Sequence, residues 1–316
     1  HYIDPNLEAE YTDEYVLGFQ HEFSDSLTVG LSYIHREASN MIEDVGLFLD
    51  EDNHVVWTWL GGIDDSLTGL DPNRQRDPRA PSRRTEGEYY EHIYWVTNVP
   101  GNDREYDGVE LSIEAGDDNW EGRLYYTWSE ANGATIEAQE DFDGITHFSG
   151  QYDTYATSQN LYGELPWSAT HDLKFYGAYW FNLTDWYEMS FGVSYQWNSG
   201  KHDSRRMKPP SIYDPSNPYH DPNDEGTWDD PPYSGYKWYF PETRGGYELP
   251  DISIIDLNWQ NRFQMSEWGT VAIILDVKNL TNDQTVIGYY PNRYQMFGYS
   301  SIKSVPRSYR VSVKYS

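Results

Sequence analysis

Apolar and polar side chains alternate along most of the periodic segments of the chain. In Tyr15–Phe23, for example, Leu17 and Phe19 fall on one side, and Gly18 and Gln20 fall on the other. Side chains of a β-strand point alternately to opposite faces, so this period of two predicts a strand with one apolar and one polar face. The segments come in pairs separated by very short turns, which predicts tight antiparallel hairpins.

The alternation predicts four hairpins and one final strand, nine strands in all. The hairpins are Tyr15–Phe23 with Leu27–Arg36, Gly108–Ala115 with Trp120–Ser129, His171–Trp180 with Tyr187–Trp197, and Ile252–Phe263 with Thr270–Leu280, and the last strand is Tyr309–Ser316. Long polar and aromatic connections lie between them, at about 38–103, 130–167, 198–249 and 281–307. Short turns at one end of a sheet and long connections at the other are typical of an outer-membrane β-barrel.

A bilayer explains the two-faced strands. Only a closed barrel satisfies the backbone of every strand in hydrocarbon, and each strand then has a lipid face and a lumen face. Aromatic residues at the predicted strand ends suit the membrane interfaces, namely Trp120, Trp128, Trp186, Tyr187 and Trp197. A soluble β-sandwich is the structural alternative, but the predicted polar faces hold Glu, Arg, Lys, Gly and Ser, which a water-filled lumen tolerates better than a core.

Composition narrows the classes of protein further. The formal net charge of -30 over 316 residues disfavours nucleic-acid binding, because a phosphate backbone would be repelled. The chain has no Cys, which excludes disulfides, Cys-ligated zinc and thiol nucleophiles. A mean hydropathy of -0.81 and the lack of a long apolar run predict no transmembrane helix. An aromatic content of 17% disfavours disorder.

Six segments carry a resemblance to a known family, and they occur in the family's order. They are Asp4–Tyr15, Arg104–Leu111, Leu124–Ser129, Leu249–Leu257, Leu275–Asn282 and Pro306–Ser316. With these segments the chain resembles the C-terminal part of the β-barrel of TonB-dependent outer-membrane receptors, most closely the Oar-like branch. The resemblance covers essentially the whole chain.

The resemblance implies an all-β, antiparallel transmembrane β-barrel with short periplasmic turns and long extracellular loops. Residues 1–316 would form its C-terminal part, about nine of about twenty-two strands, with the plug domain and the TonB-interacting segment ahead of His1. The family's final aromatic residue is missing, and a residue 317 would continue the alternation of Tyr309–Ser316. We therefore expect one Phe or Tyr after Ser316.

The resemblance also implies location in the bacterial cell outer membrane and a function in TonB-dependent active transport. Expected partners are outer-membrane lipid and lipopolysaccharide, the TonB complex and the protein's own plug domain. Siderophore, cobalamin, oligosaccharide and peptide all remain open as ligands. Two other classes also remain open: a non-transporting surface protein for adhesion, assembly or export, and a soluble carbohydrate-binding β protein.

Enzyme activity is not expected. The nine His residues are scattered, with no HExxH motif, and carboxylate pairs arise by chance among 52 acidic residues. One run fits a calcium loop in part: Asp221, Asn223, Glu225 and Asp229 fall at loop positions 1, 3, 5 and 9, although position 12 is Pro232. We expect either a Ca²⁺ site or a solvated acidic loop here, and a calorimetric titration without Ca²⁺ heat would exclude the site.

The first long connection holds a basic island in an otherwise acidic chain: Arg74, Arg76, Arg79, Arg83 and Arg84. Arginine forks bind carboxylates and phosphates, so we expect pairing with neighbouring acidic loops or with lipopolysaccharide phosphates. Aromatic residues of the long connections would stack on sugar rings or pack on one another, and they include Trp57, Trp59, Trp95, Trp228, Tyr233, Tyr236, Trp238 and Tyr239.

Overall fold

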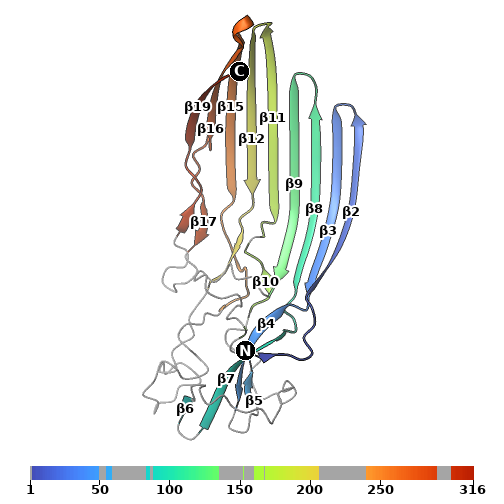
Figure 1. Ribbon diagram of the computed structural model, residues 1–316, viewed down its shortest axis with the longest axis vertical. Helices are drawn as coiled ribbons and strands as arrows, with labels where there is room; N and C mark the ends of the chain where they lie inside the picture. Colours follow the sequence, from blue (N-terminus) through green and yellow to red (C-terminus); the bar gives the residue numbers. More distant parts are fainter. Residues whose placement is uncertain are drawn as a thin grey trace.

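One antiparallel sheet dominates the computed structural model (Figure 1). The residues that the structure describes are 2–49, 55–58, 83–85, 88–134, 152, 160–166, 168–205, 240–289 and 300–316. Nine strands follow one another across this sheet in the order β19-β16-β15-β12-β11-β9-β8-β3-β2, and the short β10 pairs with β9. Their bounds are β2 Tyr11–Ser24, β3 Leu27–Ser39, β8 Arg104–Gly116, β9 Trp120–Gly133, β10 Gly163–Glu164, β11 His171–Thr184, β12 Tyr187–Asn198, β15 Ile252–Gln264, β16 Thr270–Lys278 and β19 Ser308–Tyr315.

All nine predicted strands are present, and the four predicted hairpins pair as expected. The turns between them lie together at one end of the sheet, which we call the turn side (Figure 1). A short 3-10 helix, η3 (Ser266–Trp268), forms part of the last turn. The long connections leave from the opposite end, which we call the loop side. Several strands extend further than the alternation predicts, whereas β16 ends at Lys278 because Asn279 adopts a left-handed backbone with φ 49°.

The strand register separates the two faces of the sheet. Leu17, Tyr33, Val109 and Trp128 are direct neighbours across β2, β3, β8 and β9. Directly opposed residues share a face, so these apolar side chains form one continuous surface, which we call the outward face. Leu17 on this face is 77% exposed, which shows that the outward face contacts what surrounds the sheet rather than a core of this chain.

Smaller sheets lie at the loop side, where the alternation predicted long connections without strands. One sheet contains β1 (Tyr2–Ile3), β4 (Ile42–Leu49), β5 (Val55–Thr58), β6 (Arg83–Thr85) and β7 (Glu88–Asn98). Two further pairs are β13 (His202–Asp203) with β14 (Tyr247–Glu248), and β17 (Val286–Tyr289) with β18 (Ser300–Lys303). Val45 and Trp95, opposite one another in β4 and β7, are almost completely buried, so this sheet has a small core of its own.

Within the described part of the chain the main sheet is open: β2 pairs on one side with β3, and β19 on one side with β16. An open sheet with a polar face and an exposed apolar face has the form of a segment of barrel wall. No helix among the described residues is long and apolar enough to cross a membrane.

Candidate functional site

The polar face of the main sheet concentrates the charged residues of the strands. Neighbours across strands, and in one case two residues apart on β11, bring acids and bases together on this face. Ion pairs form between Lys174 and Asp172 at 3.0 Å, Lys278 and Asp256 at 2.8 Å, Arg310 and Asp276 at 2.8 Å, Arg262 and Glu188 at 3.9 Å, and Arg36 and Glu14. Paired charges of this kind suit a hydrated interior, where they remain accessible to a polar partner.

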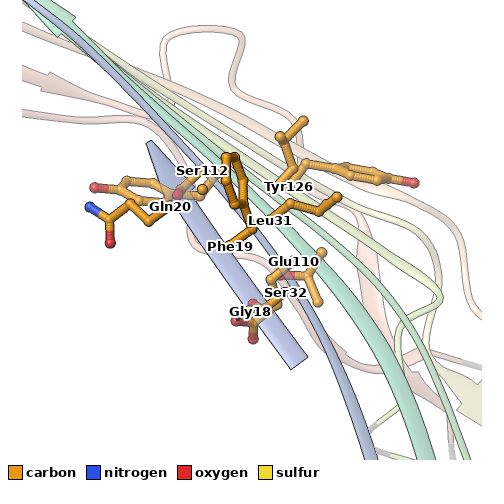
Figure 2. A pocket seen from close by; sticks show the side chains of 12 residues that line it. Gly18, Phe19, Gln20, Leu31, Ser32, Glu110, Ser112 and Tyr126 are labelled. Carbon is orange, nitrogen blue, oxygen red and sulfur yellow. Dashed lines mark hydrogen bonds between the residues drawn. The ribbon is translucent and has the colours of Figure 1, made fainter. Parts of the chain in front are cut away.

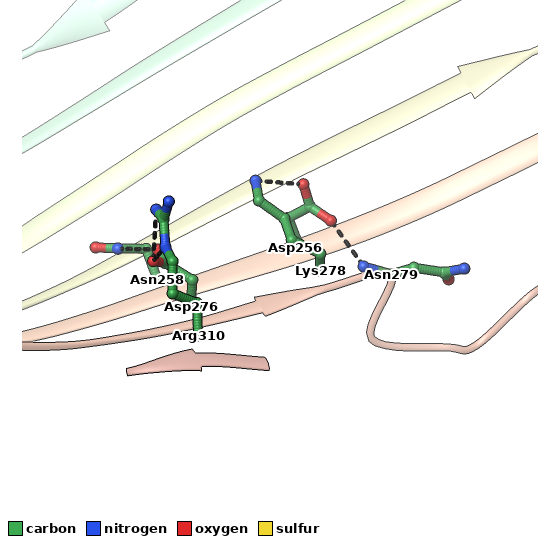
Figure 3. A network of polar contacts seen from close by, with 6 residues as sticks. All are labelled: Asp256, Asn258, Asp276, Lys278, Asn279 and Arg310. Carbon is green, nitrogen blue, oxygen red and sulfur yellow. Dashed lines mark hydrogen bonds and ion pairs between the residues drawn. The ribbon is translucent and has the colours of Figure 1, made fainter. Parts of the chain in front are cut away.

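One group of these contacts lies on β15, β16 and β19 (Figure 3). The Asp276 carboxylate accepts hydrogen bonds from the Asn258 amide at 2.7 Å and from Arg310 Nε at 2.8 Å. The Asp276 side chain is 11% exposed, whereas that of Arg310 is 73% exposed. The carboxylate therefore anchors the guanidinium, and the cation is presented to the space in front of the polar face.

A second network next to it ends strand β16. Asp256 binds Lys278 Nζ and also accepts the backbone N–H of Asn279, both at 2.8 Å. The Asn279 amide donates to the backbone oxygens of Asp283 and Val305, each at 2.8 Å. Figure 3 shows the two bonds of Asp256. Together with the bonds of the Asn279 amide they satisfy the backbone at the turn and fix where the connection to β17 leaves the sheet.

A groove of about 560 Å³ lies along β2, β3, β8 and β9 (Figure 2). Most of its lining residues belong to the polar face: Gly18, Gln20, Gly30, Ser32, Glu110, Ser112, Tyr125 and Thr127. Two glycines and two serines among them, Gly18, Gly30, Ser32 and Ser112, have small side chains. A Cβ atom at Gly30 would lie 2.5 Å from the Ser112 hydroxyl, so only glycine fits there without a shift. The small residues thus leave space for the groove on the polar face of these strands.

Two carboxylates in and beside the groove are held by hydroxyl groups rather than by cations. The Tyr125 hydroxyl donates to Glu114 at 2.6 Å, and the Ser32 hydroxyl donates to Glu110 at 3.4 Å. Glu110 lines the groove directly. Such a surface offers hydrogen-bond acceptors and negative charge to a polar or cationic group in the space in front of it.

Aromatic residues mark the two ends of the outward face. Trp120, Trp186 and Tyr187 lie at the turn side, as predicted, and Trp197 lies one residue before the end of β12. Trp128 lies inside β9 rather than at its end, because β9 continues to Gly133. Tyr187 and Trp197 are ten residues apart on one strand, about 33 Å at about 3.3 Å per residue. A strand tilted by about 40° would carry them across about 25 Å, which matches the apolar band of a membrane barrel.

The loop side has a strongly negative electrostatic environment. Partial desolvation raises the pKa of the Tyr162 hydroxyl, although the residue is 48% exposed, and the carboxylates of Glu105, Asp103 and Glu37 raise that pKa further. Nearby, Arg244 is almost completely buried, with its guanidinium 4.9 Å from the centre of the Phe240 ring. Burial of this arginine against the Phe240 ring gives the described part of the loop side a small core contact.

Most of the predicted site residues lie outside the described residues. This holds for the possible calcium ligands Asp221, Asn223, Glu225 and Asp229, and for Arg74, Arg76 and Arg79. Arg83 and Arg84 belong to β6, and Trp95 packs into the core of the small sheet rather than facing a ligand. The calcium site therefore stays a prediction.

Sequence reasoning missed one group of side chains that can bind a metal. Within the described residues, His35, Glu105 and Asp107 bring their ligand atoms within 4.8 Å of one another. His35 and Asp107 are 72 positions apart in the chain and meet because β3 and β8 place them directly opposite. Predicting this group from the sequence would have required the register between β3 and β8. The alternation of apolar and polar residues does not determine that register.

Comparisons with known proteins agree with the architecture. No protein-family model matches the chain. The TonB-dependent transporter Oar of Myxococcus xanthus is 26% identical over 295 residues, covering 90% of this chain and 22% of the transporter. The chain therefore spans about a fifth of the length of that relative.

Two solved structures share the fold. The outer-membrane transporter YddB from Escherichia coli aligns with a TM-score of 0.53 and 11% identity, covering 98% of this chain and 33% of YddB. The pyoverdine receptor FpvA from Pseudomonas aeruginosa aligns with a TM-score of 0.50 and 13% identity, covering 98% of this chain and 30% of FpvA. The predicted barrel fold class and location in the bacterial cell outer membrane are thus confirmed. By sequence and by fold, the chain resembles part of the β-barrel of a TonB-dependent outer-membrane receptor, consistent with a C-terminal piece of an Oar-like member.

Proposed function

We propose that the chain forms part of the wall of a barrel that takes up an external ligand by TonB-dependent active transport. In this proposal the long connections at the loop side capture the ligand outside the cell. The ligand then passes along the polar face when movement of a plug domain, energised through TonB, opens the lumen. The chain performs no chemistry on the ligand.

The observation that carries this proposal is the division of the sheet into two faces. Rows of opposed residues make the outward face apolar, and the next rows make the other face polar and charged, across all nine strands. A soluble sandwich would need a second layer over the apolar face, yet Leu17, Phe19, Val311 and Val313 there are 77%, 64%, 69% and 70% exposed. The name and sequence similarity of the Myxococcus relative support transport over display alone.

The proposal also names partners. Lipid and lipopolysaccharide would surround the outward face, and the plug domain of the complete protein would sit against the polar face. The anchored Arg310 and Lys278 on one half of the wall, and Glu110 in the groove on the other half, are the groups that the plug or a passing ligand would meet. The TonB complex would act through a segment outside residues 1–316.

Uptake measured with and without TonB tests the function. A strain lacking the complete receptor gene, and its complemented form, would be compared for accumulation of ferric siderophores, cobalamin, oligosaccharides and peptides. We expect one class to accumulate through the receptor, unmodified, and accumulation to stop when the TonB gene is deleted while binding at the cell surface persists. Re-supply of TonB is the matched control.

Three results would contradict the proposal. Accumulation that is unchanged without TonB would exclude energised uptake. Loss of adhesion or export in the receptor deletion, with no change in uptake of any ligand class, would favour a non-transporting surface protein. Recovery of the protein from the soluble fraction would instead favour a soluble carbohydrate-binding protein.

A further inference from the structure

Acidic side chains on the outward face gather at one place. Across the nine strands of the main sheet, which the structure describes in full, the outward positions hold no Lys or Arg. All their carboxylates lie at the loop-side ends of β2, β3, β8 and β9: Asp13, Glu37, Glu105, Asp107 and Glu130. The basic residues Arg36 and Arg104 of the same strands lie on the polar face.

The strand register places these carboxylates directly opposite one another on neighbouring strands. Asp13 lies opposite Glu37, Glu37 lies opposite Glu105, and Asp107 lies opposite Glu130. Like charges directly opposite across a strand pair are destabilising. The carboxylates in three pairs of this kind repel one another, and these strands carry no Lys or Arg on the same face to offset the repulsion. A bound cation would therefore stabilise this part of the sheet.

His35 supplies a nitrogen donor in the middle of this acidic group. Its Nδ1 lies 3.1 Å from Asp107 Oδ1, and the ligand atoms of His35, Asp107 and Glu105 all lie within 4.8 Å of one another. In a tetrahedral zinc site with bonds of about 2.0–2.1 Å, two ligand atoms are about 3.3 Å apart. The observed separation therefore fits two ligands of one ion with little movement.

A neighbouring hydroxyl holds the central carboxylate in place. The Tyr33 hydroxyl donates to Asp107 Oδ1 at 2.6 Å. Ligand carboxylates in metal sites are usually oriented by such hydrogen bonds. All of these residues project from paired strands rather than from loops, which fixes their spacing.

We propose that His35, Glu105 and Asp107 form a binding site for one divalent transition-metal ion, with Zn²⁺ as the best fit, on the outward face just beyond the loop-side aromatic residues. One imidazole and two carboxylates suit zinc, whereas Ca²⁺ takes six to eight oxygen ligands, more than this group offers. Three protein ligands leave a fourth position for water. The bound ion neutralises the opposed carboxylates and links β3 to β8 at the membrane surface.

Zinc titration of the complete receptor, purified in detergent, tests this site. Isothermal calorimetry would be run in 100 mM salt with 1 mM Ca²⁺ and Mg²⁺ to suppress weak binding to other acidic groups. We expect the variants H35Q and D107N to lose one equivalent of Zn²⁺ relative to the unchanged protein, an affinity loss of about 100-fold or more. H21Q is the matched control, because His21 is on the same face but at the turn side, between Phe19 and Phe23.

A positioning role for Tyr33 has its own readout. Y33F keeps all three ligands, so we expect it to keep the equivalent of Zn²⁺ and to weaken its affinity by about 10-fold. The heat-dependent gel mobility of each variant would confirm that its barrel is folded. Equal zinc binding by the folded unchanged protein, H35Q and D107N would overturn the proposal, and so would loss of the equivalent in H21Q. Suppression of the zinc signal by millimolar Ca²⁺ would overturn the assignment of the ion.

Discussion

Two neighbouring residues of β12 allow the orientation of the sheet to be tested by a matched pair of substitutions. Val193 is on the outward face, opposite Gly177 and Leu257, and Ser194 is on the polar face, opposite Tyr176 and Asp256. Val193 lies between Tyr187 and Trp197, close to the middle of the apolar band. We expect V193R to destabilise the protein strongly and S194R to be tolerated.

The magnitude follows from the position. Arginine on the lipid side of a barrel costs about 2–4 kcal/mol near the bilayer midplane. Because 1.4 kcal/mol corresponds to a tenfold change, V193R should shift the folding equilibrium by about 30- to 1000-fold. At Ser194 the new guanidinium faces the lumen beside Asp256, so its cost should stay below about 1 kcal/mol.

Denaturant unfolding of the complete receptor in lipid vesicles, followed by tryptophan fluorescence, measures both free energies. The folded fraction is checked by heat-dependent gel mobility. The reasoning would be refuted if S194R cost as much as V193R or more, because the apolar face would then not be the lipid face. Refutation would favour a soluble sandwich in which the outward face packs on another layer.

Three further predictions concern the polar face and the loop side. D276N should leave Arg310 without its anion and cost about 1–2 kcal/mol in denaturant unfolding, and a cost near zero would show that the pair contributes nothing. G30A should cost less than about 1 kcal/mol, because its Cβ meets only the Ser112 hydroxyl, which can rotate away, and adding S112A should remove that cost in a double-mutant cycle. Since the pKa of Tyr162 is raised in the folded state, folding stability should fall as pH rises above 10, and Y162F should show a smaller fall in the same unfolding series.

The main sheet was predictable because each strand carries its own signal. Alternation in Tyr187–Trp197 and its neighbours, together with very short turns, defines both the strands and their hairpin partners. The residues at which strands end were less predictable, since they depend on distant partners. Strand β16 stops at Lys278 because the Asn279 amide and backbone bond to Asp256, Asp283 and Val305.

Pairing between segments far apart in the chain could not be derived from the alternation. Strands β4 and β7 bring Val45 and Trp95 together in a small core. The two strands are separated by a long stretch of sequence, and nothing in their alternation indicated that they pair. The same limit hid the group of His35, Glu105 and Asp107, whose members look like isolated polar residues until the register of β3 and β8 is known. Register between non-consecutive strands is set by the whole sheet.

Site-directed spin labelling along β15 tests the central claim most directly. The chain has no Cys, so single cysteines can be placed at Ile255, Asp256, Leu257, Asn258 and Trp259 within a cysteine-free version of the complete receptor in lipid vesicles. We expect accessibility to oxygen, which concentrates in the bilayer, to be high at 255, 257 and 259 and low at 256 and 258. A water-soluble nickel complex should be excluded from the three odd positions. Accessibility that is reversed, or that does not alternate, would contradict a wall with one face in lipid and the other in the lumen.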